Sequence, residues 1–237
     1  MRRGIFVMAA LAAACALLAS AGAMRPAEAQ TQVLNQPVVL GEYATNYLWD
    51  SDPGRRINLA VASQAIDGTI LAPGAVFSFN DSVAGQSFAP AKVIIEGKVD
   101  YAEGGGLCQV SSTLYMAANY AGLKILERSP HSAELPYIQP GFDATVWLGL
   151  KDMKFKNTTG SYVIIREWMS SDGNVYAQIY GQPTGKQVAM GSYKSDSGTD
   201  KNGDGFTVWK TYKTVTRNGK VLFDGLLHTD TYHELKH

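Results

Sequence analysis

The sequence has few cysteines and no excess of either charge. Only Cys15 and Cys108 occur among 237 residues, which excludes a disulfide-rich scaffold. The 21 Lys and Arg residues balance 21 Asp and Glu residues, whereas nucleic-acid binding requires a clustered basic excess. With 46% hydrophobic and 18% charged residues, the composition also excludes a disordered chain, a collagen or a coiled coil.

The N terminus combines basic residues with a long uncharged run. Arg2 and Arg3 precede an uncharged run over 4–24, and Ala27-Glu28-Ala29 places small residues at the positions that a signal peptidase reads. This layout predicts a secretory signal peptide over 1–29, cleaved near Ala29-Gln30. We therefore expect an extracytoplasmic protein, located in the periplasm, in the cell envelope or outside the cell.

Two alternatives for the N terminus stay open, an uncleaved membrane anchor and a lipid attached to Cys15. Cleavage would leave Cys108 as the only thiol, so that no disulfide could form within the chain. The remaining residues are numerous enough to fold around a hydrophobic core alone.

The predicted domain organisation has four parts after the signal peptide. They are an N-terminal extension (30–54), a core domain (55–181), a polar linker rich in Ser, Gly, Asp and Lys (182–205) and a C-terminal β-hairpin (206–237).

Hydrophobic periodicity predicts an α+β fold, with two early helices packed on an antiparallel, β-rich second half and a C-terminal β-hairpin appendage. Apolar residues at helical spacing place helices after Arg55 and over 107–121, closed by Gly68 and Gly122. Pro53-Gly54 predicts a turn. Strands are predicted over 76–80, 92–97, 123–126, 144–150, 162–169 and 175–180.

The C-terminal hairpin has the clearest turn signal. Asn218-Gly219 between alternating segments is typical of a type I′ turn. Because an isolated hairpin is marginally stable in water, we expect Trp209 or Phe223 to lie against the core.

Cys108 is the first candidate for chemistry. It opens the strongest helix signal directly after Gly104, Gly105 and Gly106. A helix N terminus favours a thiolate over a thiol, and the amides from Gly104 to Leu107 could bind an oxyanion.

His131 and a carboxylate complete the inventory of a thiol nucleophile, a base and a group that orients the base. The sequence predicts Cys108, His131 and Asp143 as catalytic residues, with Glu134 as a second choice for the orienting carboxylate. The alternative stays open that Cys108 is a small buried hydrophobic residue and that His131 and Asp143 are loop and turn residues.

A polar stripe on the Cys108 helix predicts the floor of a binding site. The predicted ligand-binding residues are Gly104, Gly105, Gly106, Gln109, Ser111, Ser112 and Tyr115.

No metal site and no cofactor are predicted. Asp200-Lys-Asn202-Gly-Asp204-Gly205 matches the first half of a calcium loop, but Thr211 occupies the position of the bidentate glutamate. A polar turn is the preferred interpretation of this segment.

Several ungapped blocks resemble the VanW family. The sharpest are the block from Gly104 to Tyr115, including Gly-Gly-Gly-Leu-Cys-Gln, and the block Glu127-Arg-Ser-Pro-His-Ser132. Further blocks are 73–80, 141–146 and 152–157, so that the resemblance covers about 55–181. Gln86-Ser87 departs from the Arg-Thr pair expected there.

The resemblance implies an exported or envelope-anchored accessory protein of glycopeptide resistance, in a family where some members carry peptidoglycan-binding domains. The first hypothesis is a Cys-dependent enzyme that performs acyl transfer or hydrolysis on peptidoglycan or its precursors. The alternative is a non-catalytic peptidoglycan-binding or scaffolding module. No nucleic-acid partner is expected, and the oligomeric state is left open.

Overall fold

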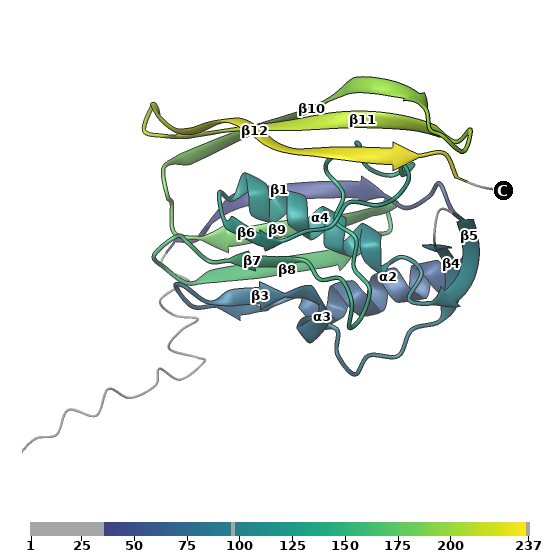
Figure 1. The fold of residues 1–237 in the computed structure, drawn as a ribbon. Helices are drawn as coiled ribbons and strands as arrows, with labels where there is room; N and C mark the ends of the chain where they lie inside the picture. Colours follow the sequence, from purple (N-terminus) through teal and green to yellow (C-terminus); the bar gives the residue numbers. More distant parts are fainter. Residues whose placement is uncertain (1–35, 96–97, 236–237) are drawn as a thin grey trace, which may run out of the picture.

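The computed structural model describes residues 36–95 and 98–235 and confirms the α+β class. Its central sheet is antiparallel, with the strand order β1 (Val38–Asn46), β9 (Asn174–Gly181), β8 (Val163–Met169) and β2 (Ile70–Leu71) (Figure 1). The strands predicted over 162–169 and 175–180 are β8 and β9, and they form the centre of this sheet. The predicted signal peptide lies outside the described residues.

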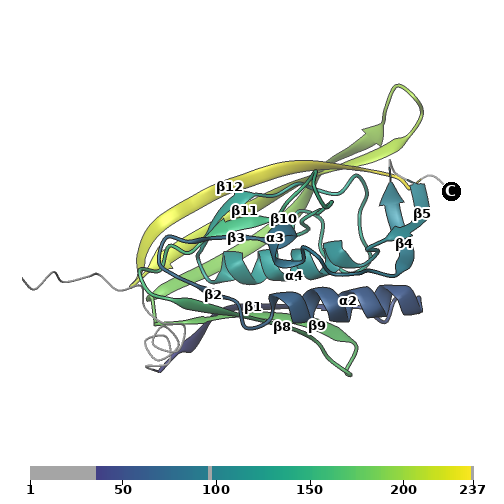
Figure 2. The ribbon, with the colours of Figure 1, turned by 90° about the horizontal axis from the view of Figure 1, so that it is seen from below.

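Two helices cover one face of the central sheet, as predicted. Helix α2 (Pro53–Ile66) packs on β8, and α4 (Leu107–Tyr120) packs on β1 and β9 (Figure 2). The predicted turn at Pro53-Gly54 is instead the first turn of α2, because the Asp52 side chain caps that helix by accepting from the amides of Gly54 and Arg55. Within the part of the chain that the structure describes, no helix is both long and apolar enough to cross a membrane.

Helix α4 is the buried centre of the molecule. Its residues from Gln109 to Asn119 are all buried, polar ones included. The helix begins after Gly106, whose φ of 112° favours glycine, and ends before Gly122 with a φ of 68°. An ordinary amphipathic helix exposes its polar stripe, so the polar stripe of α4 must be covered by other parts of the chain.

Smaller elements surround the helices. A second sheet has the order β3 (Val76–Ser78), β7 (Lys154–Lys156), β6 (Lys124–Glu127), and β4 (Pro90–Ile95) pairs with β5 (Lys98–Glu103). The short helix α3 (Phe79–Ser82) follows β3.

The strand predicted over 144–150 is wrong, since the described part of this segment forms only an isolated bridge between Trp147 and Lys151. Its backbone is bonded elsewhere. The Ala144 amide donates to the hydroxyl of Ser112 on α4, and the Thr145 amide donates to the carbonyl of Ser129.

The C-terminal residues form a three-stranded antiparallel sheet of β10 (Lys186–Thr199), β11 (Gly205–Arg217) and β12 (Lys220–His233). The predicted hairpin is confirmed: Asn218 and Gly219 connect β11 to β12 with φ values of 51° and 78°. The polar linker predicted over 182–205 is wrong, because most of it is β10. Its Ser, Gly and Lys content resembles a loop, yet it pairs with β11 through backbone hydrogen bonds that tolerate these residues.

The C-terminal sheet packs against the core and covers the polar side of α4 (Figures 1 and 2). The Lys213 ammonium donates to the amide oxygen of Asn119 on α4 at 2.8 Å. The indole of Trp209 donates to Glu134 in a core loop at 2.9 Å, whereas Phe223 is exposed. One of the two aromatic residues thus contacts the core as expected.

Strand β1 lies in the predicted N-terminal extension but is an integral strand of the central sheet. Its partner β9 follows more than a hundred residues later in the chain, and a register shift near Gly41 interrupts its side-chain alternation. Gly41 also lies directly against the end of α4, where a Cβ would overlap the amide nitrogen of Ala121 and the carbonyl oxygen of Ala117. Close contact between β1 and α4 therefore requires glycine here.

Replacement of Gly41 by alanine should destabilise the fold by about 1–3 kcal/mol. The added Cβ would overlap backbone atoms of α4, which cannot move aside as a flexible side chain can. Gly225→Ala is the matched control, because its Cβ would meet no atom within 4 Å, and we expect a change within about 0.5 kcal/mol. Urea denaturation followed by circular dichroism measures both. Equal stabilities of the two variants would contradict the close packing of β1 on α4.

Candidate functional site

Cys108, His131 and Asp143 lie together, although they come from three different segments. Cys108 is in the first turn of α4, His131 is in the loop after β6, and Asp143 is in the segment that crosses α4. One carboxylate oxygen of Asp143 accepts hydrogen bonds from Nδ1 and from the backbone amide of His131, both at 2.7 Å. The other ring nitrogen, Nε2, is therefore free to bond the Cys108 thiol. The His131 ring and this thiol interact.

The Cys108 thiol is partly buried, and its surroundings favour the ionised form. Its Sγ lies 3.4 Å from the carbonyl oxygen of Val146. Burial raises the pKa of Cys108, but the charge of His131, a hydrogen bond with its ring and the charge of Arg55 outweigh burial, so the pKa lies below its ordinary value. Position at a helix N terminus acts in the same direction.

His131 is held in its charged form by the groups on either side of it. Burial lowers the pKa of the imidazole, but the negative charge of Cys108 and the hydrogen bond to Asp143 raise it to about 9. Both shifts favour the charged pair of thiolate and imidazolium over the neutral thiol and imidazole. That pair is the activated form of a cysteine nucleophile.

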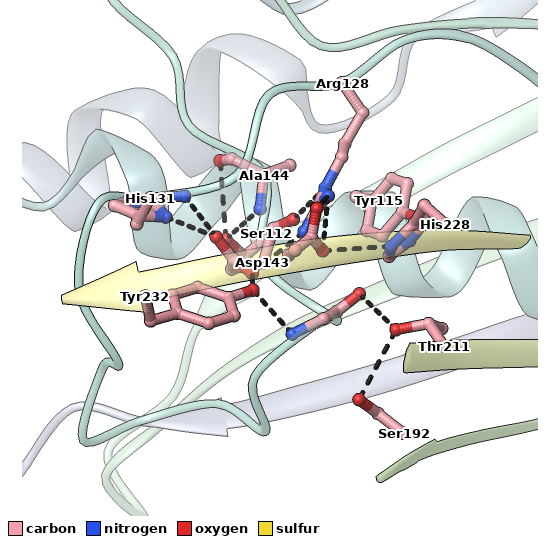
Figure 3. A network of polar contacts seen from close by, with 12 residues as sticks. Ser112, Tyr115, Arg128, His131, Asp143, Ala144, Ser192, Thr211, His228 and Tyr232 are labelled. Carbon is pink, nitrogen blue, oxygen red and sulfur yellow. Dashed lines mark hydrogen bonds and ion pairs between the residues drawn. The ribbon is translucent and has the colours of Figure 1, made fainter. Parts of the chain in front are cut away.

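Asp143 is the most strongly compensated charge of the site (Figure 3). Its second oxygen accepts from the hydroxyl of Tyr232 at 2.6 Å and from Nη2 of Arg128 at 3.0 Å. Burial raises the pKa of Asp143, but the hydrogen bond and charge of His131 and the charge of Arg128 hold it well below its usual range. Asp143 is therefore ionised at neutral pH.

A second layer of residues fixes Arg128. Its Nε donates to the backbone carbonyl of Asp143 at 2.7 Å, and its Nη1 donates to both carboxylate oxygens of Asp230 at 2.7 Å. The Asp230 carboxylate also meets Nδ1 of His228 at 2.9 Å. Charge thus alternates from His131 through Asp143 and Arg128 to Asp230, and this order favours a single arrangement.

The three glycines before Cys108 allow close packing. Gly105 lies against the backbone of β4, where a Cβ would overlap the carbonyl oxygen of Lys92. Among the amides predicted to bind an oxyanion, those of Gly104 and Leu107 donate to the carbonyls of Ala89 and Gly104. These two amides are consequently engaged within the protein.

The other predicted ligand-binding residues are buried and bonded to protein atoms. Ser111 and Ser112 donate to the carbonyl of Ala144, and Ser112 also accepts from the amide of Ala144. Tyr115 contacts His228 and lies under Arg128, and burial raises the pKa of its phenol to about 12. Ser111 and Ser112 of the polar stripe thus hold the segment next to Asp143 in place.

Gln109 has a similar role on the opposite side of Cys108. Its Oε1 accepts from Arg55 at 2.6 Å, while its Nε2 donates to the hydroxyl of Thr45 and the carbonyl of Asn46, each at 3.0 Å. Gln109 is fully buried and connects α4, α2 and β1.

The sequence reasoning missed several residues at the site: Trp49, Arg55, Arg128, Tyr137, Asp230 and Tyr232. Arg128 lies in the family-like block 127–132 and Tyr137 lies within the region of resemblance, so their closeness to His131 in the sequence was the available signal. Trp49 and Tyr232 carry no local pattern that distinguishes them from ordinary aromatic residues. Glu134, the second choice for the orienting carboxylate, instead accepts from Thr207 and Trp209.

No metal centre accompanies this site in the described ranges, where no three His, Cys, Asp or Glu side chains group as metal ligands. The segment that partly matches a calcium loop is a turn in which Asp200 accepts from the amides of Asn202 and Asp204.

The pH dependence of Cys108 alkylation tests the ion pair. In the unchanged protein the midpoint should lie below the ordinary value of about 8.5. In His131→Asn it should rise above that value, because burial remains while the positive partner is lost. His233→Asn is the control, since the His233 ring contacts Phe206 in the C-terminal sheet. Stopped-flow alkylation with iodoacetamide measures all three, and an unchanged midpoint in His131→Asn would refute the pairing.

Known proteins are similar to this chain over the region that contains the site. The family model described as VanW like protein matches residues 54–180. The chain is 39% identical over 131 residues to the uncharacterized protein YoaR of Bacillus subtilis, covering 54% of this chain and 43% of the relative. It is 28% identical over 152 residues to the vancomycin B-type resistance protein VanW of Enterococcus faecalis, covering 60% of this chain and 53% of the relative.

The matched region is thus about half the length of these curated relatives. No solved structure matches the chain. Since the family model covers more than half of the sequence and includes Cys108, His131 and Asp143, the chain belongs to the VanW family.

Proposed function

We propose that this protein is an exported enzyme of the cell envelope that uses Cys108 for acyl transfer or hydrolysis at a peptide-type carbonyl of peptidoglycan or its precursors. The observation that carries the proposal is the contact chain from Asp143 through His131 to Cys108. Asp143 fixes the orientation of the imidazole with two hydrogen bonds of 2.7 Å, and the imidazole lowers the pKa of the thiol. This is the arrangement that thiol-dependent catalysis requires.

In the proposed reaction the thiolate of Cys108 attacks the carbonyl carbon, and a sulfur–carbon bond forms. His131 gives its proton from Nε2 to the departing amine as the carbon–nitrogen bond breaks. Water or an acceptor amine then attacks the thioester, giving its proton to His131 and releasing the thiolate. Asp143 keeps the imidazole in the orientation needed for both proton transfers.

Two features support the location and the substrate. The N-terminal arginines, the uncharged run and the Ala27-Glu28-Ala29 site favour export. One relative is named a vancomycin B-type resistance protein, and we connect that resistance with the cell wall. Peptide bonds of the peptidoglycan stem are the corresponding carbonyl substrates.

Incubation of the purified protein with peptidoglycan and with soluble stem peptides tests the proposal, with mass spectrometry of the products. Cys108→Ala should abolish turnover, and Asp143→Asn should lower kcat by about two to four orders of magnitude because the imidazole loses its orienting group. His233→Asn should leave turnover unchanged. Turnover that survives in Cys108→Ala would exclude the thiol mechanism.

A second candidate function is a non-catalytic peptidoglycan-binding module. Trp168 and Tyr176 favour it, because their rings stack at 5.2 Å on the face of the central sheet opposite α2 and α4, and exposed aromatic rings can contact sugars through their apolar faces. Co-sedimentation with peptidoglycan separates the two functions. Binding that is lost in Trp168→Ala and unaffected in Cys108→Ala, without turnover, would favour the module.

A further inference from the structure

Arg55 is a buried cation beside the nucleophile. The residue is only 5% exposed, and among the described residues no carboxylate lies within ion-pair distance of its guanidinium. One nitrogen, Nη2, donates to Gln109, whereas Nε has no hydrogen-bond partner in the described chain. A guanidinium has five N–H donors, and an unpaired buried charge is costly unless a partner arrives.

The position of Arg55 points to the Cys108 site. Arg55 packs closely on Gly106: a Cβ atom added to Gly106 would lie 3.3 Å from the Cγ of Arg55 and 3.3 Å from its carbonyl oxygen. Gly106 and Gln109 flank Cys108 on α4, so the guanidinium is held against the helix start that carries the thiol.

Two aromatic rings enclose the guanidinium. Its Cζ is 4.5 Å from the ring centroid of Trp49 and 5.7 Å from that of Tyr137, and the two rings stack at 5.9 Å. These rings remove water from Arg55 and thereby strengthen its attraction for an anion. Trp49 is 43% exposed, so this aromatic pair forms the border between the guanidinium and solvent.

The nearby carboxylates have other functions. Asp52 caps α2 through Oδ1. Asp50 accepts from the amide of Asp52 at 3.0 Å and lies 4.0 Å from the ammonium of Lys92. Both attract Arg55 from a distance, and neither forms a direct ion pair with it in the described structure.

We propose that Arg55 is a substrate-binding residue that holds a carboxylate of the substrate close to the carbonyl attacked by Cys108. The substrate class is then a peptide or acyl donor with a free carboxylate near the scissile bond, such as a C-terminal carboxylate. A planar guanidinium suits this partner because it can donate two parallel hydrogen bonds to one carboxylate. This inference rests on the proposed function for its substrate, but the anion site itself can be measured without turnover.

Alkylation of Cys108 by iodoacetate and iodoacetamide tests the anion site, because the reagents are similar in size and differ in charge. Rates are measured at a pH where the thiol of each variant is fully ionised, and mass spectrometry of the Cys108 peptide excludes signal from Cys15. The iodoacetate-to-iodoacetamide rate ratio should fall about tenfold in Arg55→Gln and much less in Arg55→Lys. Arg56→Gln is the matched control on the exposed side of α2 and should keep the original ratio.

Equal loss of both rates in Arg55→Gln would overturn the inference and leave Arg55 as a residue that stabilises only the thiolate. A second measurement needs no variant. N-acetylalanine should protect Cys108 of the unchanged protein from iodoacetamide, whereas N-acetylalaninamide should not, and equal protection by both compounds would also overturn the inference. Anion preference without peptidoglycan turnover would refute the proposed enzyme while retaining the anion site.

Discussion

The buried carboxylate of Asp143 is the charge on which the rest of the structure depends. An unpaired carboxylate in a protein interior is strongly unfavourable, yet Asp143 is only 1% exposed. Four donors compensate it: two from His131, one from Arg128 and one from Tyr232. Because Asp143 also orients His131, the same interactions that make the core stable prepare the thiol for reaction.

These donors connect the family domain to the C-terminal sheet. The VanW match ends at residue 180, whereas Tyr232 and the Asp230 carboxylate that holds Arg128 belong to β12. Strand β12 therefore helps to hold Asp143 and Arg128 in position. The neighbouring strand β11 helps to bury the polar side of α4, since its Lys213 donates to the side chain of Asn119.

The site has two sides that differ in chemistry. On the Asp143 side, both carboxylate oxygens of Asp143 and the Arg128 guanidinium are paired within the protein, which keeps the imidazole in one orientation. On the Arg55 side the pairing is incomplete, because Nε has no hydrogen-bond partner among the described residues and the guanidinium lies beside two aromatic rings. Complete pairing suits groups that must stay fixed, and incomplete pairing suits a group that awaits a ligand.

The sequence by itself determined the features that depend on neighbouring residues. Helical spacing located α2 and α4, Asn218-Gly219 located the last hairpin, and the glycines before Cys108 marked a helix N terminus that favours a thiolate. The Cys, His and carboxylate inventory could also be read directly, because few residue types perform thiol chemistry.

Only the tertiary structure decided which distant residues meet. Strand β1 was missed because its hydrogen-bonding partner is β9, and β10 was missed because backbone pairing with β11 overrides a loop-like composition. Arg55 and Tyr232 have no local signal for a role at the site, since their importance comes from the burial of a guanidinium beside Cys108 and of a phenol on Asp143. Burial and charge compensation depend on all the segments that surround a group, and no short stretch of sequence contains that information.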